Sequence, residues 1–134
     1  MRLLKAVDIL IFDIQRQLTP DLLNGIYKTD SDNPLRGHCY VATETIYWIL
    51  RDKPNYKSYK PYVLTHKEWP THLKPGETHW YLMSSNLDVI DATAQQFNVD
   101  IDDIPHWKGK PNGMMNHPIG GSKRSRILRS RLSI

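Results

Sequence analysis

The chain has 134 residues, 40% of them hydrophobic and 24% charged, which is the composition of one globular domain with a single core. Its formal net charge is +4, and no stretch approaches the roughly 18 consecutive apolar residues of a membrane span, so a membrane protein is not expected. Its one cysteine, Cys39, cannot form an internal disulfide, and we therefore expect a reducing, cytoplasmic location.

Helices are predicted first along the chain. Apolar residues at helical spacing predict an amphipathic helix over 2–18. The segment 19–26 begins with Thr-Pro-Asp, the pattern of a helix start, and predicts a second short helix. Over 39–51, apolar residues cover most of a helical surface, so we expect a central helix that ends before Pro54.

Strands are predicted next. The segment 59–65 is typical of a strand, with Pro61 favouring an edge position. Two further strands, 78–84 and 87–93, are joined at residues 85–86 in what we expect to be a tight hairpin turn. Helices followed by strands indicate the α+β class.

The C-terminal part begins with an irregular segment, 98–121, rich in Pro and Gly. Ser122 is then expected to cap a last short helix, in which Leu128 and Leu132 lie one turn apart. We expect one domain over 1–134, with the residues of chemical interest at about 36–97 and a basic C-terminal segment at 104–134.

Cys39 stands where the central helix is predicted to begin, two residues after Gly37. A helix N-terminus or a neighbouring imidazolium lowers a thiol pKa that is ordinarily about 8.5, and the thiolate is the nucleophilic form. Glycine beside a thiol lets a substrate approach the backbone closely. Taken alone, however, a free cysteine is more often a packed core residue.

His79 and Asp91 favour the reactive interpretation. In the predicted hairpin the two residues lie roughly opposite each other, and cross-strand neighbours have Cβ atoms about 4.5–5.5 Å apart. A carboxylate at that distance can accept a hydrogen bond from the imidazole and fix its tautomer. A thiol, a base and a residue that orients the base are the general pattern of an activated nucleophile.

Three segments resemble the transglutaminase-like branch of the papain-like superfamily. The segment 36–51, RGHCYVATETIYWILR, is similar to its cysteine helix, and 78–82, THWYL, to its histidine strand. The segment 89–97, VIDATAQQF, resembles the Asp-x-Thr that supplies the third residue, and the chain order matches. GHCY, HW and the later SKR also resemble small phage-encoded proteins, a resemblance that implies no particular substrate.

The superfamily resemblance implies a papain-like core, in which a central helix carrying Cys39 packs on a small antiparallel sheet carrying His79 and Asp91. It implies cysteine-dependent acyl chemistry, as a hydrolase, amidase, protease or acyltransferase, on an unidentified protein, peptide or small-molecule substrate. Papain-like enzymes add a side-chain amide before the cysteine, a part that Asn33 would play, although it is equally a turn residue. His38 and Trp80 are further candidates for substrate contacts.

No metal site and no cofactor are predicted. The motif His66-x-Glu68 lacks the Cys-x-x-Cys of zinc deaminases, and neither HExxH nor paired-cysteine spacing occurs. The histidines at positions 72, 106 and 117 lie in predicted loops and receive no role.

The segment 104–134 holds seven Lys or Arg and no Asp or Glu; subtracting +7 from +4 leaves −3 for residues 1–103. Such asymmetry indicates either an anionic partner such as nucleic acid or docking on the acidic body. Trp69 or Trp107 would stack on a base, and the acidic residues available for docking include 100, 102 and 103. The alternative to an enzyme is thus a small nucleic-acid- or protein-binding module with a vestigial triad. Its candidate phosphate contacts are Lys123, Arg124, Arg126, Arg129 and Arg131.

Overall fold

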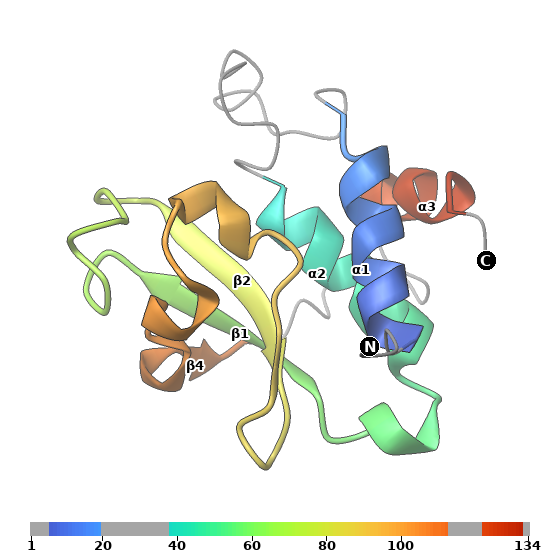
Figure 1. Ribbon diagram of the computed structural model, residues 1–134, viewed down its shortest axis with the longest axis horizontal. Coiled ribbons are helices and arrows are strands. Elements are labelled where there is room, and N and C mark those ends of the chain that lie inside the picture. The colour runs from blue at the N-terminus through green and yellow to red at the C-terminus, as the bar shows by residue number, and fades with distance from the viewer. Residues whose placement is uncertain (1–5, 20–37, 113–121, 133–134) are drawn as a thin grey trace, which may run out of the picture.

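The structure is a computed structural model that describes residues 6–19, 38–112 and 122–132. Helices pack beside a small antiparallel sheet, which confirms the α+β class (Figure 1). Among the described residues, no helix is both long and apolar enough to cross a bilayer. The elements are α1 (Ala6–Gln17), α2 (Cys39–Leu50), β1 (Lys60–Thr65), β2 (Thr78–Met83), β3 (Val89–Ile90), β4 (Lys110–Pro111) and α3 (Lys123–Ser130), with short 3-10 helices at Pro54–Tyr56, Ala94–Phe97, Ile101–Asp103 and His106–Lys108.

Most predicted elements are present, with shorter bounds. The predicted helix at 2–18 corresponds to α1, the predicted helix at 39–51 to α2, and the strand at 59–65 to β1. The short helix expected at 19–26 lies almost wholly outside the described residues.

The sheet has the order β3-β2-β1-β4, and every pair is antiparallel. The prediction for the β2–β3 hairpin is wrong in two respects. Instead of a strand over 87–93, β3 has only two residues. The turn is also wider than two residues, because the Ser84 amide donates to the Asp88 carbonyl (2.9 Å) and the Ser84 hydroxyl accepts from the amides of Asn86 (3.2 Å) and Asp88 (3.0 Å).

The wider turn shifts the register of the hairpin by two residues. Leu82 pairs with Ile90, which places position 91 opposite Tyr81 rather than opposite His79. Side chains alternate along a strand, so a shift of two leaves positions 79 and 91 on the same face. The strand ends before Asp91, and its side chain is free to turn toward His79.

The short β3 leaves the first half of β2 beside α2. The Thr43 hydroxyl donates to the carbonyl of Trp80 (3.0 Å), and the sulfur of Cys39 lies 3.7 Å from the carbonyl of Thr78. Cys39 and Thr43 are one helical turn apart, and the two carbonyls are two residues apart on β2. Contacts between α2 and β2 therefore hold the N-terminus of α2 next to His79.

Two apolar cores lie on the two faces of the sheet. Helix α2 packs on one face, with α1 and α3 packed against α2, and the segment 94–108 covers the other face (Figure 1). The first core contains Ile14, Val41, Ala42, Ile46, Leu82, Ile90 and Leu128, and the second contains Leu64, Trp69, Leu73, Tyr81, Met83 and Ile104.

The C-terminal helix α3 is docked on α2. The Ser122 hydroxyl caps it by accepting from the amide of Ser125 (3.3 Å), as predicted. The buried carboxylate of Glu44 accepts from both the amide (2.9 Å) and the hydroxyl (2.6 Å) of Ser122. Leu128 is fully buried in the first core, and Leu132 packs at its margin. The two leucines thus dock the helix on the body.

Candidate functional site

The structure brings together the three residues that the sequence singles out. Cys39 is the first residue of α2, His79 lies in β2, and Asp91 directly follows β3. All three are buried, with Cys39 6% exposed. The Asp91 carboxylate and, to a smaller extent, the Cys39 thiol raise the pKa of His79.

The His79 ring is oriented by the carboxylate. Its Nε2 atom lies 2.6 Å from Asp91 Oδ2, a bond between two side chains with no exposed surface. Because a carboxylate only accepts, Nε2 must carry the proton, which leaves Nδ1 as the acceptor in the neutral ring. Gln96 Nε2 lies 3.3 Å from Nδ1, so the amide can donate to this nitrogen when the ring is neutral.

A second imidazole binds the same carboxylate oxygen. His106 Nε2 lies 2.8 Å from Asp91 Oδ2, and the buried ring of His106 packs edge-on against Tyr81 at 4.6 Å between centroids. The Tyr81 hydroxyl donates to the carbonyl of His106 (2.6 Å), which fixes the backbone there. Gly109 is required nearby, because a Cβ at that position would collide with the Tyr81 hydroxyl.

Sequence reasoning missed His106. It lies between a proline and a tryptophan in an irregular segment, 15 residues after Asp91, and no local pattern separates it from the other loop histidines. It also falls outside 36–97, where the residues of chemical interest were expected. Gln96 was missed as well, although it stands in the quoted VIDATAQQF segment.

The loop after β3 holds the carboxylate from its other side. Asp91 Oδ1 accepts from the amide of Thr93 (3.3 Å), and the Thr93 hydroxyl accepts from Gln96 Nε2 (3.0 Å). The spacing of an Asp-x-Thr segment thus closes a local turn. The neighbouring carbonyl of Ala92 is tied to α1 through Gln15 Nε2 (2.7 Å).

Charge within this cluster is set by the carboxylate and the imidazoles. Burial by itself lowers the pKa of His79, but the Asp91 carboxylate outweighs burial and raises that pKa to about 10. Burial by itself raises the pKa of Asp91, but the imidazoles of His79 and His106 lower it to about 2. The imidazolium of His79 and the carboxylate of Asp91 are therefore the favoured forms at neutral pH.

The other predicted contact residues are placed differently. Asn33 lies outside the described residues. His38 is 2% exposed, and its Nε2 pairs with the carbonyl of Thr19 at 2.9 Å, so its ring is packed against the end of α1 rather than presented to a substrate. Trp80 is half-buried, with its ring edge-on to that of Tyr40 at 4.9 Å.

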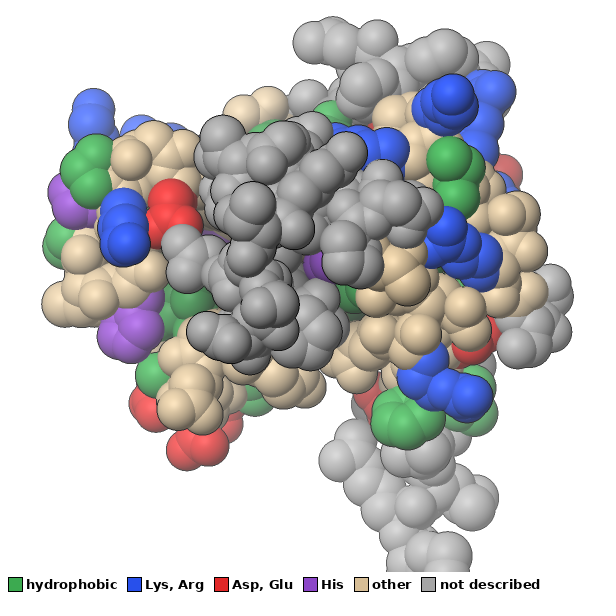
Figure 2. All heavy atoms as spheres, turned by 90° about the horizontal axis from the view of Figure 1, so that it is seen from above, with side chains coloured by type: hydrophobic (Ala, Val, Ile, Leu, Met, Phe, Trp, Pro, Cys, Tyr) green, Lys and Arg blue, Asp and Glu red, His purple; other side chains and the backbone are tan. Residues whose placement is uncertain are grey.

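The candidate nucleic-acid contacts lie on and just after α3. Lys123, Arg126 and Arg129 are exposed, whereas Arg131 Nη1 donates to the Thr19 hydroxyl (2.6 Å) and the carbonyl of Gln17 (3.2 Å). Arg124 is half-buried near Tyr40. Burial and the Glu44 carboxylate raise the pKa of Tyr40, and Arg124 opposes them with a smaller effect. In Figure 2, Lys and Arg side chains stand in separate groups on the right, the side on which Figure 1 places α1 and α3.

The two tryptophans proposed for base stacking differ in solvent exposure. Trp69 is buried in the second core, between His72 and Phe97, so the prediction that it stacks on a base is wrong. Trp107 is 63% exposed, so the structure does not contradict the prediction for this residue.

Three residues of the site also form a group with metal-ligand chemistry. The ligand atoms of His79, Asp91 and His106 lie within 4.8 Å of one another. Both nitrogens approach one oxygen at 2.6 and 2.8 Å, which are hydrogen-bond lengths. Ligand atoms held at about 2.0–2.2 Å around a tetrahedral zinc ion would stand about 3.4 Å apart, so the side chains would have to separate to admit one.

The described residues thus define an α+β protein with a buried thiol–imidazole–carboxylate cluster and a second imidazole on the carboxylate. The chain matches no protein-family model, and neither a curated protein nor a solved structure is significantly similar to it. Only the fold and the geometry of this cluster therefore indicate a function.

Proposed function

We propose that this protein is a cysteine-dependent acyl-transfer enzyme with a papain-like core, acting by hydrolysis or by transfer to an acceptor. The observation that carries the proposal is the bond from His79 Nε2 to Asp91 Oδ2. That bond commits one ring nitrogen to the carboxylate and leaves the other for proton exchange with the adjacent thiol of Cys39.

In the first step, the sulfur of Cys39 attacks the carbonyl carbon of the acyl group, and a C–S bond forms. His79 holds the proton taken from the thiol and delivers it to the leaving amine, alcohol or thiol as the bond to that group breaks. The backbone N–H of Cys39, at the start of α2, is a donor for the oxyanion.

In the second step, water or an acceptor attacks the thioester carbon and gives up a proton to His79. The C–S bond then breaks, and His79 delivers that proton to the departing sulfur. Asp91 remains ionised throughout, because both imidazoles stabilise its charge. Its part is to hold the tautomer and the orientation of His79.

His106 acts as a positioning residue in this proposal. Its side chain forms a hydrogen bond with Asp91. Among the described residues, no bond joins it to the Cys39 thiol or to the ring of His79. Its backbone is fixed by Tyr81 and its side chain by the carboxylate, so it limits the rotation of Asp91.

A hollow of about 510 Å³ offers a path for the acyl chain. Its lining includes Thr78, whose carbonyl is in contact with the sulfur of Cys39. The lining carries charges of both signs, Lys67 and Lys110 against Glu68 and Glu77. Both carboxylates are engaged locally, Glu68 with Thr65 and Glu77 with the amide of Lys74.

The test is alkylation of Cys39 by iodoacetamide near neutral pH, followed by intact-mass analysis. We expect the thiol to react faster than a cysteine in an unstructured peptide, and His79→Ala to slow the reaction severalfold. His72→Ala is the matched control, because that exposed ring stacks on Trp69 outside the site. Reaction no faster than the free peptide, or a slowing equal in the two variants, would refute the proposal.

Intact-mass analysis after incubation with a cell extract identifies the acyl group. An added mass on Cys39 that hydroxylamine removes would be the thioester of the first step, because hydroxylamine cleaves thioesters. A Cys39→Ser variant should form no such adduct.

A second candidate function is nucleic-acid binding through the C-terminal segment, with the triad inactive. The observation that favours it is the exposure of Lys123, Arg126 and Arg129 along α3, together with the exposed ring of Trp107. Docking of α3 on the body does not oppose it, because the cations stand on the outer side of the helix.

A further inference from the structure

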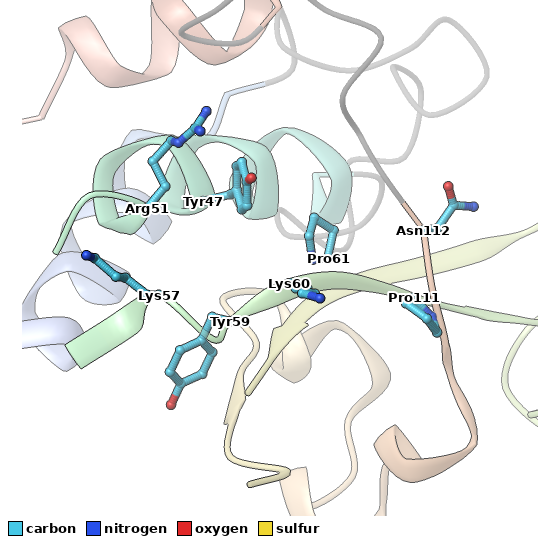
Figure 3. Close-up of a pocket in the computed structure, with 8 residues that line it drawn as sticks. All are labelled: Tyr47, Arg51, Lys57, Tyr59, Lys60, Pro61, Pro111 and Asn112. Atoms are coloured by element: carbon cyan, nitrogen blue, oxygen red, sulfur yellow. The ribbon is translucent and has the colours of Figure 1, made fainter. Parts of the chain in front are cut away.

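The hollow beside the C-terminal end of α2, of about 540 Å³, holds no group of converging side chains. Figure 3 shows that Arg51, Lys57 and Tyr59 point in different directions from its walls. A hollow of about 480 Å³ beside the β2–β3 hairpin is different. One of its walls is the turn of the hairpin, and the other belongs to the 3-10 helices Ile101–Asp103 and His106–Lys108 (Figure 1). Two separate parts of the chain thus meet around it.

Three exposed apolar side chains line this hollow. Leu87 is 63% exposed, Ile101 47% and Trp107 63%. The other large apolar side chains that are exposed in the described part of the chain, Ile9 and Phe12, both lie on α1. Exposed apolar side chains scattered singly are ordinary, but a group of them around one hollow marks an interaction surface.

The walls and floor of the hollow are fixed before any partner binds. Met83 and Ile104 line it from the second core, in which both are buried. The buried ring of His106 also lines it, and the hydrogen bond from this ring to Asp91 fixes the residue that directly precedes Trp107. A partner would therefore bind to a surface that needs little ordering, which favours affinity.

Leu87 stands in a conformation that a leucine rarely adopts. Its φ is +67°, and its amide donates to the carbonyl of Ser84 (3.0 Å) within the turn. A side chain other than glycine in this left-handed region costs about 1–3 kcal/mol, and asparagine is tolerated there more readily. Because the Leu87 side chain is mostly exposed, its burial offsets little of that cost. This combination favours a contact with a partner over a role in folding.

The charges that line the hollow have one sign. Asp88 directly follows Leu87, and Asp102 directly follows Ile101, so each wall carries an apolar side chain next to a carboxylate. None of the described lining residues is Lys or Arg. The carboxylates attract a cationic partner and repel phosphate groups, which disfavours nucleic acid and anionic lipid at this surface.

We propose that this hollow binds a segment of a partner protein in which an apolar side chain stands between Lys or Arg residues. The apolar side chain packs among Leu87, Ile101 and Trp107, and the flanking cations pair with Asp88 and Asp102. Binding requires no reaction at the thiol, so the proposal does not depend on the acyl chemistry proposed above.

The test is an NMR titration of the full ¹⁵N-labelled chain with three capped peptides: Lys-Lys-Leu-Lys-Lys, Lys-Lys-Ser-Lys-Lys and Glu-Glu-Leu-Glu-Glu. We expect the first peptide to shift the amide signals of residues 87–88 and 101–102 saturably. The other two peptides should bind at least about tenfold more weakly, because each lacks either the apolar side chain or the cations.

Variants of the lining separate the contributions to binding. Trp107→Ala should weaken binding of the leucine peptide about tenfold, and Asp102→Asn about threefold. Asp100→Asn is the matched control, because that exposed carboxylate lies outside the lining and its loss should leave binding unchanged. Leu87→Asn should also weaken binding, with a melting temperature equal to or above that of the unmodified chain, because asparagine fits the backbone there.

Several outcomes would overturn the proposal. They are no saturable shift with the leucine peptide, equal affinity for the serine peptide, and an equal loss in the Asp100 and Asp102 variants. Concentration-dependent self-association that shifts the same amide signals would assign the hollow to a second copy of this chain. Binding of a single-stranded oligonucleotide that shifts them would assign it to nucleic acid.

Discussion

His106 donates from Nε2 to Asp91 Oδ2 over 2.8 Å, so the carboxylate that orients His79 is itself held by a second buried imidazole. One carboxylate oxygen has two lone pairs, so Asp91 Oδ2 can accept from the Nε2 atoms of both imidazoles at once. Removal of either ring therefore changes the environment of the other, although the two rings come from different segments of the chain.

The first prediction concerns this link. His106→Leu removes the donor and should slow alkylation of Cys39 severalfold, because Asp91 loses a restraint and His79 loses orientation. His106→Gln can place an amide donor near the former Nε2 position and should restore most of the rate.

The two variants separate a positioning role from a purely structural one. Melting temperatures measured in parallel show how far each variant is destabilised. If the leucine and glutamine variants react at equal rates while both are folded, His106 has no role in positioning the carboxylate.

Much of the site could be predicted because its parts carry local signals. The start of α2 at Cys39 follows from the apolar pattern, and the common face of positions 79 and 91 follows from strand alternation. The prediction that the two positions share a face is correct although the predicted turn is wrong, because the register shifted by two residues and not by one.

The remainder depends on contacts that no local pattern encodes. The Ser84 hydroxyl selects the wider turn by binding two amides further along, and a serine there is equally compatible with a tight turn. His106 reaches Asp91 because the segment 94–108 folds across the sheet, and that path is fixed by packing of Ile104 and Tyr81 in the second core. Glu44 is a buried carboxylate in an otherwise apolar helix. Its hydrogen-bond partner, Ser122, lies far along the chain, so no local pattern explains why this carboxylate is buried.

The second prediction concerns Asp91→Asn. An asparagine would direct an amide donor, or a single weaker acceptor, at two imidazole N–H groups and the amide of Thr93. Buried donors left without an acceptor cost about 1–3 kcal/mol each. We therefore expect both a loss of Cys39 reactivity and a measurable fall in the free energy of unfolding.

From the hairpin alone, this variant would be expected to keep its stability. The structure changes that expectation, because the carboxylate accepts three hydrogen bonds rather than one. Chemical denaturation of the two proteins at neutral pH measures the difference. An unchanged free energy of unfolding would mean that the His106 contact contributes nothing to the folded state.

The third prediction is a two-sided dependence of stability on pH. The folded pKa of His79 is raised from 6.5 to about 10, so its contribution is complete below pH 6.5 and is lost as the pH rises toward 10. The folded pKa of Asp91 is lowered from 3.8 to about 2, so its contribution is present above pH 3.8 and is lost as the pH falls toward 2.

Denaturant unfolding across that range should therefore show a plateau between the two flanks. The Asp91→Asn variant should lose most of the alkaline decline, because the imidazole then has no carboxylate that holds its proton. An alkaline flank of equal size in both proteins would assign that decline to other groups.

The last prediction decides what the C-terminal helix does. Leu128 is fully buried in the first core, and truncation of such a side chain costs about 2–5 kcal/mol, a large part of the total stability of about 5–15 kcal/mol that small domains possess. Leu128→Ala, and more strongly removal of 122–134, should destabilise the whole domain. Arg129→Gln, an exposed substitution on the same helix, should change stability by no more than about 0.5 kcal/mol.

Salt dependence separates docking from nucleic-acid binding. If α3 only docks, no oligonucleotide binds at micromolar protein, and Arg129→Gln has no phenotype. If its exposed cations contact phosphates, the logarithm of the affinity falls linearly with the logarithm of salt concentration, by about 0.7–0.9 per phosphate neutralised. Arg129→Gln would then reduce that slope by about one contact while leaving the melting temperature and the alkylation of Cys39 unchanged, because a residue on the outer side of α3 touches neither the core nor the thiol.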